Sequence, residues 1–142
     1  MLIEEWKLAY AAGLIDGEGC ISINQPYNRG FFQLNVEITM SDEKPIQFLA
    51  DTFGGICTPK KTKTVTGRTM YRWGIQSEKA QSFLELIRPY IVGKIYQVKT
   101  ALEFPVGSKD GKQLYGKGRE IPQDIAELRY DLWEHMKDLK AP

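Results

Sequence analysis

Cysteine and histidine are scarce in this chain of 142 residues, and their scarcity excludes several kinds of site. Cys20 and Cys57 do not have the spacing of a C-x-x-C metal motif. They leave a disulfide open, although two reduced thiols in an intracellular protein are the default. The single histidine, His135, excludes a histidine-rich zinc site and disfavours a Ser-His-Asp triad. We interpret it as a surface residue of a C-terminal helix.

Long apolar runs and targeting signals are also missing. No stretch approaches the roughly 20 apolar residues of a transmembrane helix, so we expect no membrane partner. The acidic residues 1–5 lack a signal-peptide pattern. We therefore expect an intracellular protein, in an organelle (chloroplast or mitochondrion) or a prokaryotic cytoplasm. The length suits one core, and we predict a single domain over residues 1–142.

Excess charge of one sign is absent overall, but the charges are unevenly distributed. The chain has 19 basic and 18 acidic residues, a net charge of +1. Residues 52–77 nevertheless carry five basic side chains and no acidic one. Residues 19–36 carry Arg29 and again no acid, whereas acids gather near both ends. A positive region of this kind is typical of contact with a polyanion such as a nucleic acid.

Hydrophobic periodicity predicts the elements of the fold. We expect helices over 4–15, from an N-cap at Ser41 to about 52, and over 78–88, 92–103 and 122–139. We expect strands over 20–25, 31–39, 56–63 and 68–76, and a loop over 105–120. The last helix is expected to bury Ile125, Leu128, Leu132 and Met136.

The order of these elements predicts an α+β fold with an αββαββα core and additional C-terminal helices. The strands form two hairpins, so the four-stranded sheet should be mostly or wholly antiparallel. Each strand alternates apolar and polar residues, so helices should cover only one face.

The first helix is apolar nearly all round, which is typical of a helix that is buried on more than one side. Four small or acidic residues fall on one narrow stripe of it: Ala9, Ala12, Gly13 and Asp16. A small-residue stripe lets a second helix approach closely. The chain contains one such helix, so we predict that the partner comes from a second copy.

The stretch Ala11-Ala12-Gly13-Leu14-Ile15-Asp16-Gly17-Glu18-Gly19 resembles the signature of the LAGLIDADG homing endonucleases. It departs at Ala11, where the family usually has leucine, and at Glu18, where aspartate and glutamate are both common. The family core has the same αββαββα order with a saddle-shaped sheet, so the resemblance extends over residues 4–104. Single-motif members are homodimers whose motif helices pair on the two-fold axis. We expect the two carboxylates to lie in a glycine-rich turn after the helix.

The resemblance implies a metal-dependent nuclease. Glu18 would be the metal-binding carboxylate from each subunit, and the Gly17 carbonyl a further ligand. Asp16 would be mainly structural, and it is also a candidate ligand. Lys94 matches a lysine of the family's basic pocket, and Lys44 lies where another basic residue often sits. Met40 replaces a water-positioning glutamine of some relatives, so Gln47 or solvent would act instead. We expect Mg²⁺ or Mn²⁺ to support cleavage, and Ca²⁺ to bind without supporting it efficiently.

The polar sheet face is the predicted DNA-binding surface, because a β-ribbon fits the major groove. Arginine pairs there with guanine, asparagine or glutamine with adenine, and glutamate with cytosine. We assign Lys61 and Lys63 to this face and Lys60 to phosphate contact, but the register of 56–63 is open, because a bulge at Pro59 would exchange Lys60 and Lys61. The candidate DNA-binding residues are Ser22, Asn24, Tyr27, Asn28, Arg29, Gln33, Asn35, Glu37, Lys60, Lys61, Lys63, Arg68, Arg72 and Gln76.

A two-fold dimer predicts a long, pseudo-palindromic double-stranded DNA site, of which both strands are cut. The principal alternative is a maturase that binds intron RNA, or a non-cleaving DNA-binding or RNA-binding protein on the same fold. A second alternative is a β-rich interaction module without a nucleic-acid role. Salt-sensitive DNA binding and metal-dependent cleavage distinguish the three.

Overall fold

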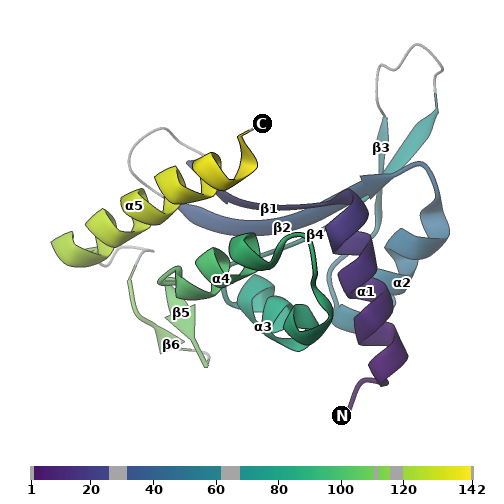
Figure 1. Cartoon of the computed structure of the whole chain (residues 1–142), viewed down its shortest axis with the longest axis horizontal. Helices are drawn as coiled ribbons and strands as arrows, with labels where there is room; N and C mark the ends of the chain where they lie inside the picture. Colours follow the sequence, from purple (N-terminus) through teal and green to yellow (C-terminus); the bar gives the residue numbers. More distant parts are fainter. Residues whose placement is uncertain (1, 26–31, 62–67, 111, 116–119, 142) are drawn as a thin grey trace.

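The computed structural model describes residues 2–25, 32–61, 68–110, 112–115 and 120–141, and only the backbone of Lys60 and Lys61. The elements are α1 (Glu5–Glu18), β1 (Gly19–Asn24), β2 (Gln33–Met40), α2 (Glu43–Phe53), β3 (Thr58–Lys61), β4 (Thr69–Gln76), α3 (Ser77–Ile87), η1 (Arg88–Tyr90), α4 (Ile95–Glu103), β5 (Ser108–Lys109), β6 (Lys112–Gln113) and α5 (Gln123–Lys140). The predicted αββαββα order is confirmed (Figure 1). The region expected to be a loop contains the short β5–β6 hairpin.

The first helix is longer than the sequence predicts, which changes the position of its acidic residues. α1 continues to Glu18, so Asp16 and Glu18 lie in its last turn and not in a separate glycine-rich turn. β1 begins at the next residue, Gly19, whose N–H donates to the Ile15 carbonyl. A Cβ on Gly19 would lie only 2.7 Å from the Ile15 Cα. The helix can therefore pass into the strand without a loop only because this residue is glycine.

The second helix begins one residue later than expected. Its N-cap is Asp42 and not Ser41, and the Asp42 side chain accepts a hydrogen bond from the Lys44 N–H at 3.3 Å. An aspartate at this position satisfies one of the unpaired N–H groups of the first turn.

The four long strands form one wholly antiparallel sheet in the order β1-β2-β4-β3. Val36 in the centre pairs with Ile21 on one side and Ile75 on the other. Directly opposed residues share a face, so the apolar residues of three strands align. The predicted antiparallel sheet is therefore confirmed, and β2 lies between β1 and β4, with β3 at the far edge.

The β3–β4 register corrects one sequence-based assignment. β3 pairs residue for residue with β4, with Lys60 opposite Met70 and Lys61 opposite Thr69, and Pro59 causes no bulge. Position 60 therefore belongs to the polar row that contains Arg72. Position 61, which the sequence analysis assigned to that row, belongs to the other face.

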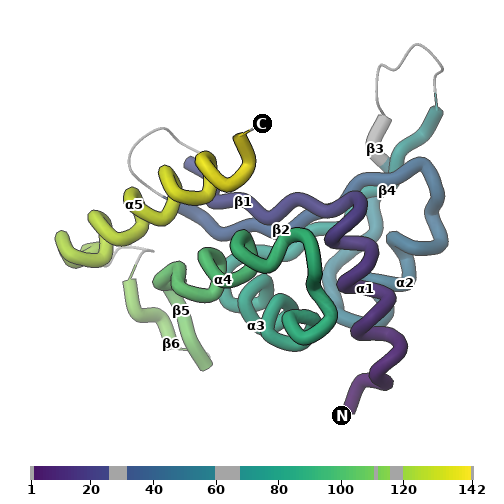
Figure 2. Tube along the Cα trace, in the orientation of Figure 1, coloured from purple at the N-terminus to yellow at the C-terminus, as the bar shows by residue number. Residues whose placement is uncertain are grey.

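The apolar face of the sheet forms the core beneath helices α1 to α4, which lie on one side of it (Figure 2). At the centre, Trp73 is fully buried, and its ring centroid lies 5.1 Å from that of Phe83. The Trp73 indole N–H donates to the Gly54 carbonyl at 2.8 Å, so the polar atom of this large side chain is satisfied. The strand residues of the core are Ile21, Ile23, Leu34, Val36, Ile38, Trp73 and Ile75.

The last helix, α5, packs against α4 and the edge strand β1, with one correction to its predicted apolar face. Leu132 and Met136 are buried as expected, but Leu128 is exposed and its neighbour Arg129 is buried. The Arg129 guanidinium lies over the Phe104 ring at 5.1 Å, and its Nε donates to a backbone carbonyl at 2.9 Å. Burial lowers the pKa of Arg129. The arginine cation is planar and weakly hydrated, so it can be buried at a position where a hydrophobic pattern does not predict a buried residue.

Two further features concern the described part of the chain. Cys20 and Cys57 are both free thiols, the first exposed and the second half-buried. Of the helices described, none combines the length and apolarity that crossing a bilayer requires.

Candidate catalytic end and nucleic-acid interface

Hydrogen bonds connect the last turn of α1 to the segment that follows η1. The Asp16 carboxylate accepts hydrogen bonds from the Val92 N–H at 2.8 Å and from the Lys94 N–H at 2.9 Å. Burial raises the pKa of Asp16, but the amides of Val92, Lys94 and Gly93 and the Lys94 charge together hold it below its usual value. Both carboxylate oxygens are thus engaged, which favours the structural role of Asp16 over a role as metal ligand.

Lys94 lies at the same end of α1. Its ammonium donates to the Asp16 carbonyl at 2.7 Å, which places a cation at the C-terminal end of the helix, where the helix dipole favours positive charge. Glu18 follows Asp16 by two residues in the same turn. The structure therefore places the Lys94 ammonium at the last turn of α1, the turn that also contains Glu18.

Glu18 itself is exposed and has no hydrogen-bond or salt-bridge partner among the residues that the structure describes. Gly17 is also exposed, and a Cβ placed on it would meet no atom within 4 Å. In the described ranges, no group of three histidine, cysteine, aspartate or glutamate side chains could hold a metal ion. One copy of the chain therefore offers one carboxylate and nearby backbone oxygens at this end of α1.

The remaining candidates for catalysis lie on α2. Gln47 is exposed and its amide donates to Asp51 at 2.8 Å, one turn further along the same helix. Lys44 is exposed in the first turn, and Met40 packs partly buried against the core. The contacts described for Gln47 thus stay within α2 and do not link it to Glu18.

The outer side of α1 is a stripe of small residues that no other described element covers. Ala9, Gly13 and Gly17, spaced by four, are all exposed. Trp6 and Tyr10 flank the stripe with 58% and 42% of their surface exposed. We call Ala9, Gly13 and Gly17 the outer stripe.

The expected interface stripe needs two corrections. Ala12 is fully buried in its own chain with Ala11 and Ile15, so it belongs to the inner side of α1. Asp16 is occupied by the backbone of residues 92–94. The prediction erred because a helix that is apolar all round does not reveal which of its small residues faces its own sheet.

The polar side of the sheet, away from α1 to α4, is called the open face here. Asn24 and Gln76 are exposed on it, Ser22 and Gln33 are half-buried, and the Gln33 amide donates to Gln76 at 3.4 Å. Arg68, the residue before β4, is exposed. The role of these residues in DNA binding stays a prediction. Four candidates, Tyr27, Asn28, Arg29 and Lys63, lie outside the described residues.

Three other residues of the open face contact one another. Glu37 on β2 forms a salt bridge with Arg72 on β4, whose Nε donates to Glu37 Oε2 at 3.0 Å. Asn35 is only 5% exposed, although the sequence analysis expected it to be accessible to DNA. It is buried because it lies in the central strand beside this pair.

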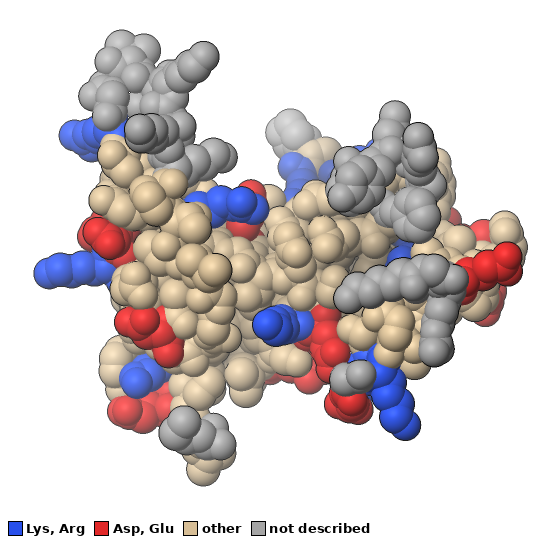
Figure 3. All heavy atoms as spheres, turned by 180° about the vertical axis from the view of Figure 1, so that it is seen from behind, with Lys and Arg blue, Asp and Glu red and all other residues tan. Residues whose placement is uncertain are grey.

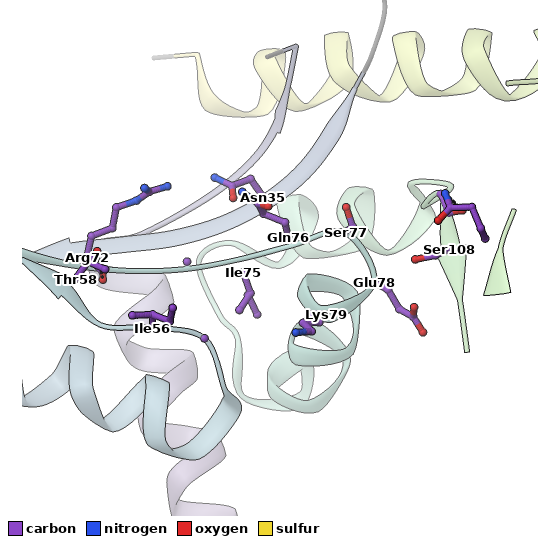
Figure 4. Close-up of a pocket in the computed structure, with 14 residues that line it drawn as sticks. Asn35, Ile56, Thr58, Arg72, Ile75, Gln76, Ser77, Glu78, Lys79 and Ser108 are labelled. Atoms are coloured by element: carbon purple, nitrogen blue, oxygen red, sulfur yellow. Dashed lines mark hydrogen bonds between the residues drawn. The ribbon is translucent and has the colours of Figure 1, made fainter. Parts of the chain in front are cut away.

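A groove of about 690 Å³ runs from the open face over the end of β4, toward the start of α3 and the β5–β6 hairpin (Figure 4). Asn35, Arg72 and Gln76 line one part of it, and Ser77 and Ser108 another. Sequence reasoning missed the second part, because its segments are distant in sequence and carry no motif.

A second contact that the sequence does not predict brings α5 to the open face. The Lys140 ammonium donates to the exposed Cys20 thiol at 3.2 Å, across 120 positions of sequence. Cys20 pairs with Glu37 in the sheet and follows Glu18 by two residues. The end of α5 therefore adds a positive charge near the last turn of α1.

The rear of the molecule does not carry a charge of one sign. Figure 3, which views the chain from behind, shows acidic and basic side chains interspersed around a broad uncharged area. This agrees with the near balance of charge over the whole sequence.

Comparison with known proteins identifies the family. The family described as LAGLIDADG endonuclease matches residues 11–101, more than half of the chain. No curated protein matches the sequence significantly. Similar solved structures are the archaeal intron-encoded homing endonuclease I-Vdi141I with DNA (TM-score 0.64, 19% identity, 96% of both chains covered) and the homing endonuclease I-CvuI with a DNA target (0.60, 18%, 97% of both). The LAGLIDADG homing endonuclease I-GzeII with its DNA target is also similar (0.52, 13%, covering 99% of this chain and 44% of that one). The chain belongs to the LAGLIDADG endonuclease family.

Proposed function

We propose that this chain is a homing endonuclease that cuts both strands of a long, pseudo-palindromic DNA site, acting as a homodimer with a divalent cation. The observation that carries the proposal is the position of Glu18. Glu18 is exposed at the end of α1, whose outer stripe no described element covers. It directly precedes β1, the first strand of the polar sheet face.

The outer stripe supports the homodimer. Its residues Ala9, Gly13 and Gly17 repeat with the small-xxx-small spacing that allows two helix backbones to approach closely. Exposed Trp6 and Tyr10 beside the stripe add apolar surface that a second copy would cover. That the chain spans 44% of the I-GzeII chain also suits an assembly of two copies. Pairing about a two-fold axis at this stripe would bring the two Glu18 side chains together.

The donor set at this point fits a hard divalent cation. Glu18 and the Gly17 carbonyl offer oxygen atoms, which Mg²⁺ and Mn²⁺ prefer, and each copy leaves Glu18 without an internal partner in its described part. Such a cation supplies an activated water and neutralises charge on the phosphate during hydrolysis. I-CvuI was crystallised on DNA in the presence of Mg and of Ca, which supports a divalent cofactor here.

Lys94 contributes a charge that the chain itself supplies. One of its three N–H donors is bound to the Asp16 carbonyl, and the others remain for a phosphate oxygen. The Asp16 carboxylate accepts a hydrogen bond from the Lys94 N–H, which holds the lysine at the last turn of α1. Lys94 would thus hold the DNA backbone at the reacting position, where positive charge stabilises the developing negative charge.

The open face would bind the major groove on each side of the reacting centre. Amide and guanidinium groups from β1, β2 and β4 provide the donors and acceptors that base edges require. Solved neighbours with DNA support this choice of partner.

Selection of cleavable sites from a randomised duplex library tests the proposal. We expect Mg²⁺ to yield products cut in both strands at related, pseudo-palindromic sites, whereas EDTA abolishes cutting and Ca²⁺ gives binding with little cutting. Sedimentation velocity should give a dimer. Sequence-specific binding without cutting under any metal would instead favour a non-cleaving DNA-binding protein or a maturase. A strict monomer on DNA would refute the proposal.

A further inference from the structure

A salt bridge crosses the centre of the open face between two residues that the sequence analysis assigned to separate bases. Arg72 Nε and Nη2 both donate to Glu37 Oε2, the first at 3.0 Å. The two residues are not directly opposed in the sheet, since Glu37 pairs with Gly74 and Arg72 with Thr39. The contact is therefore diagonal across two strands.

Gly74 provides the space for this diagonal contact. A Cβ at Gly74 would lie 3.8 Å from Arg72 Nη2 and 3.5 Å from the Glu37 Cβ. The guanidinium thus passes over a position without a side chain. A longer side chain there would stand between Arg72 and Glu37.

Asn35 joins the same carboxylate from the other side. Its Nδ2 donates to Glu37 Oε2 at 3.4 Å, while its buried Oδ1 has no hydrogen-bond partner among the residues that the structure describes. Glu37 Oε2 therefore collects donors from Asn35 and from two nitrogens of Arg72. These donors occupy Oε2, so of the two carboxylate oxygens only Oε1 is left to accept a hydrogen bond from a base.

Arg72, in contrast, retains donors. A guanidinium has five N–H groups in a planar fork, and Glu37 takes only the edge formed by Nε and Nη2. The opposite edge, formed by Nη1 and Nη2, remains for a second pair of acceptors. The Arg72 side chain is 42% exposed against 33% for Glu37, and it rises above β4 beside Asn35 (Figure 4).

We propose that Arg72 reads a guanine in the major groove and that Glu37 is a positioning residue that sets the orientation of its guanidinium. The free edge of the fork matches the O6 and N7 acceptors of guanine. Glu37 holds this edge in one orientation before DNA binds, so less side-chain freedom is lost on binding. The inference rests on the proposed function and names one element of its specificity, in place of the cytosine contact that glutamate alone suggests.

The test is a binding selection from a DNA library with randomised half-sites, in Ca²⁺, read by sequencing the bound fraction. For Arg72→Ala we expect the preference for guanine to fall about tenfold or more at one base pair of each half-site. Glu37→Ala should lower the preference at that same base pair several-fold, and the double variant should match Arg72→Ala. Arg72→Lys should keep the charge and lose the preference, because lysine has no fork.

Two further variants separate positioning from a change in charge or folding. Glu37→Gln keeps an acceptor oxygen and should retain part of the guanine preference. Glu43→Ala removes an exposed negative charge from the first turn of α2 and should leave the preference unchanged. Thermal melting should show that each variant folds.

Three results would overturn the inference. If Glu37→Ala changes a different base pair from Arg72→Ala, or if the two effects add in the double variant, Glu37 reads a base by itself. If Arg72→Ala leaves every guanine preference intact, Arg72 is not the reader. Wild-type protein that enriches no sequence would refute the proposed function as well, whereas the first two results would leave it standing.

Discussion

The two sides of α1 differ in what they contact. On the inner side, Ala11, Ala12 and Ile15 are fully buried against the protein's own core. On the outer side, Ala9, Gly13 and Gly17 are exposed, although they are no more polar. Folding of one chain explains why the inner residues are small or apolar, but it does not explain the small, apolar residues on the outer side.

The same division holds for the two acidic residues of the last turn. Asp16 is held by the amides of Val92 and Lys94, whereas Glu18 is exposed and without a partner in the described part of the chain. The inner half of the helix therefore stabilises the fold, and we propose that its outer half binds a second chain and takes part in the reaction. Substitutions on each side should separate these purposes.

The largest effect is expected on the outer side, from Glu18→Gln. Loss of the carboxylate should lower the rate of DNA cleavage by about a thousandfold or more, because it removes several kcal/mol of stabilisation that a bound metal provides. The thermal midpoint and DNA affinity should change little, since Glu18 is exposed and has no hydrogen-bond or salt-bridge partner among the described residues. Single-turnover cleavage and gel-shift assays give both quantities. Cleavage at the wild-type rate would remove Glu18 from its role.

The next comparison sets Ala12→Leu against Gly13→Leu. Leucine at the buried position 12 overpacks the core and should lower the free energy of unfolding by about 1–3 kcal/mol. At Gly13 a Cβ meets nothing within 4 Å, so the same side chain should leave the fold intact and weaken the dimer. Urea denaturation and sedimentation measure the two outcomes. A Gly13→Leu protein that remains fully dimeric would show that the outer stripe is not the interface.

The smallest effect is expected from Asp16→Asn and depends on pH. Because hydrogen bonds hold the folded pKa of Asp16 below its usual value of about 4, the carboxylate stabilises the fold above that pH. This contribution is lost as pH falls through the folded pKa. The difference in stability between wild type and variant should thus be full at pH 7 and shrink below about pH 4. A difference that does not vary with pH would argue against the ionised carboxylate as the source.

The local patterns predicted the sheet well. The alternation of Ile21 and Ile23 with polar neighbours, and of Leu34, Val36 and Ile38 in the next strand, gave the buried face directly, because the period of a strand is short and regular. The end of α1 was harder to predict, because the close packing of Gly19 on Ile15 is a contact between two elements.

The parts of the site that sequence could not predict depend on contacts between distant residues. Nothing near Asp16 in the sequence indicates that its carboxylate binds amides 76 and 78 positions away. Glu37 and Arg72 each fit a base-reading pattern, and only the register of β2 and β4 shows that they lie diagonally across the two strands, within reach of each other. Ala12 and Gly13 are equally small, and only the packing assigns them to opposite sides.

The absence of a loop between α1 and β1 sets a rule for changing the target of this protein. Glu18 ends the helix and Gly19 begins the strand, so the side chains of β1 have a fixed phase relative to the glutamate. Substitution at Ser22 or Asn24 leaves that phase intact. An insertion of one residue after Gly19 would turn Ile21 and Ile23 toward solvent, since a shift by one position exchanges the two faces of a strand. Retargeting should therefore proceed by exchange of side chains along the sheet, and never by a change in the length of this junction.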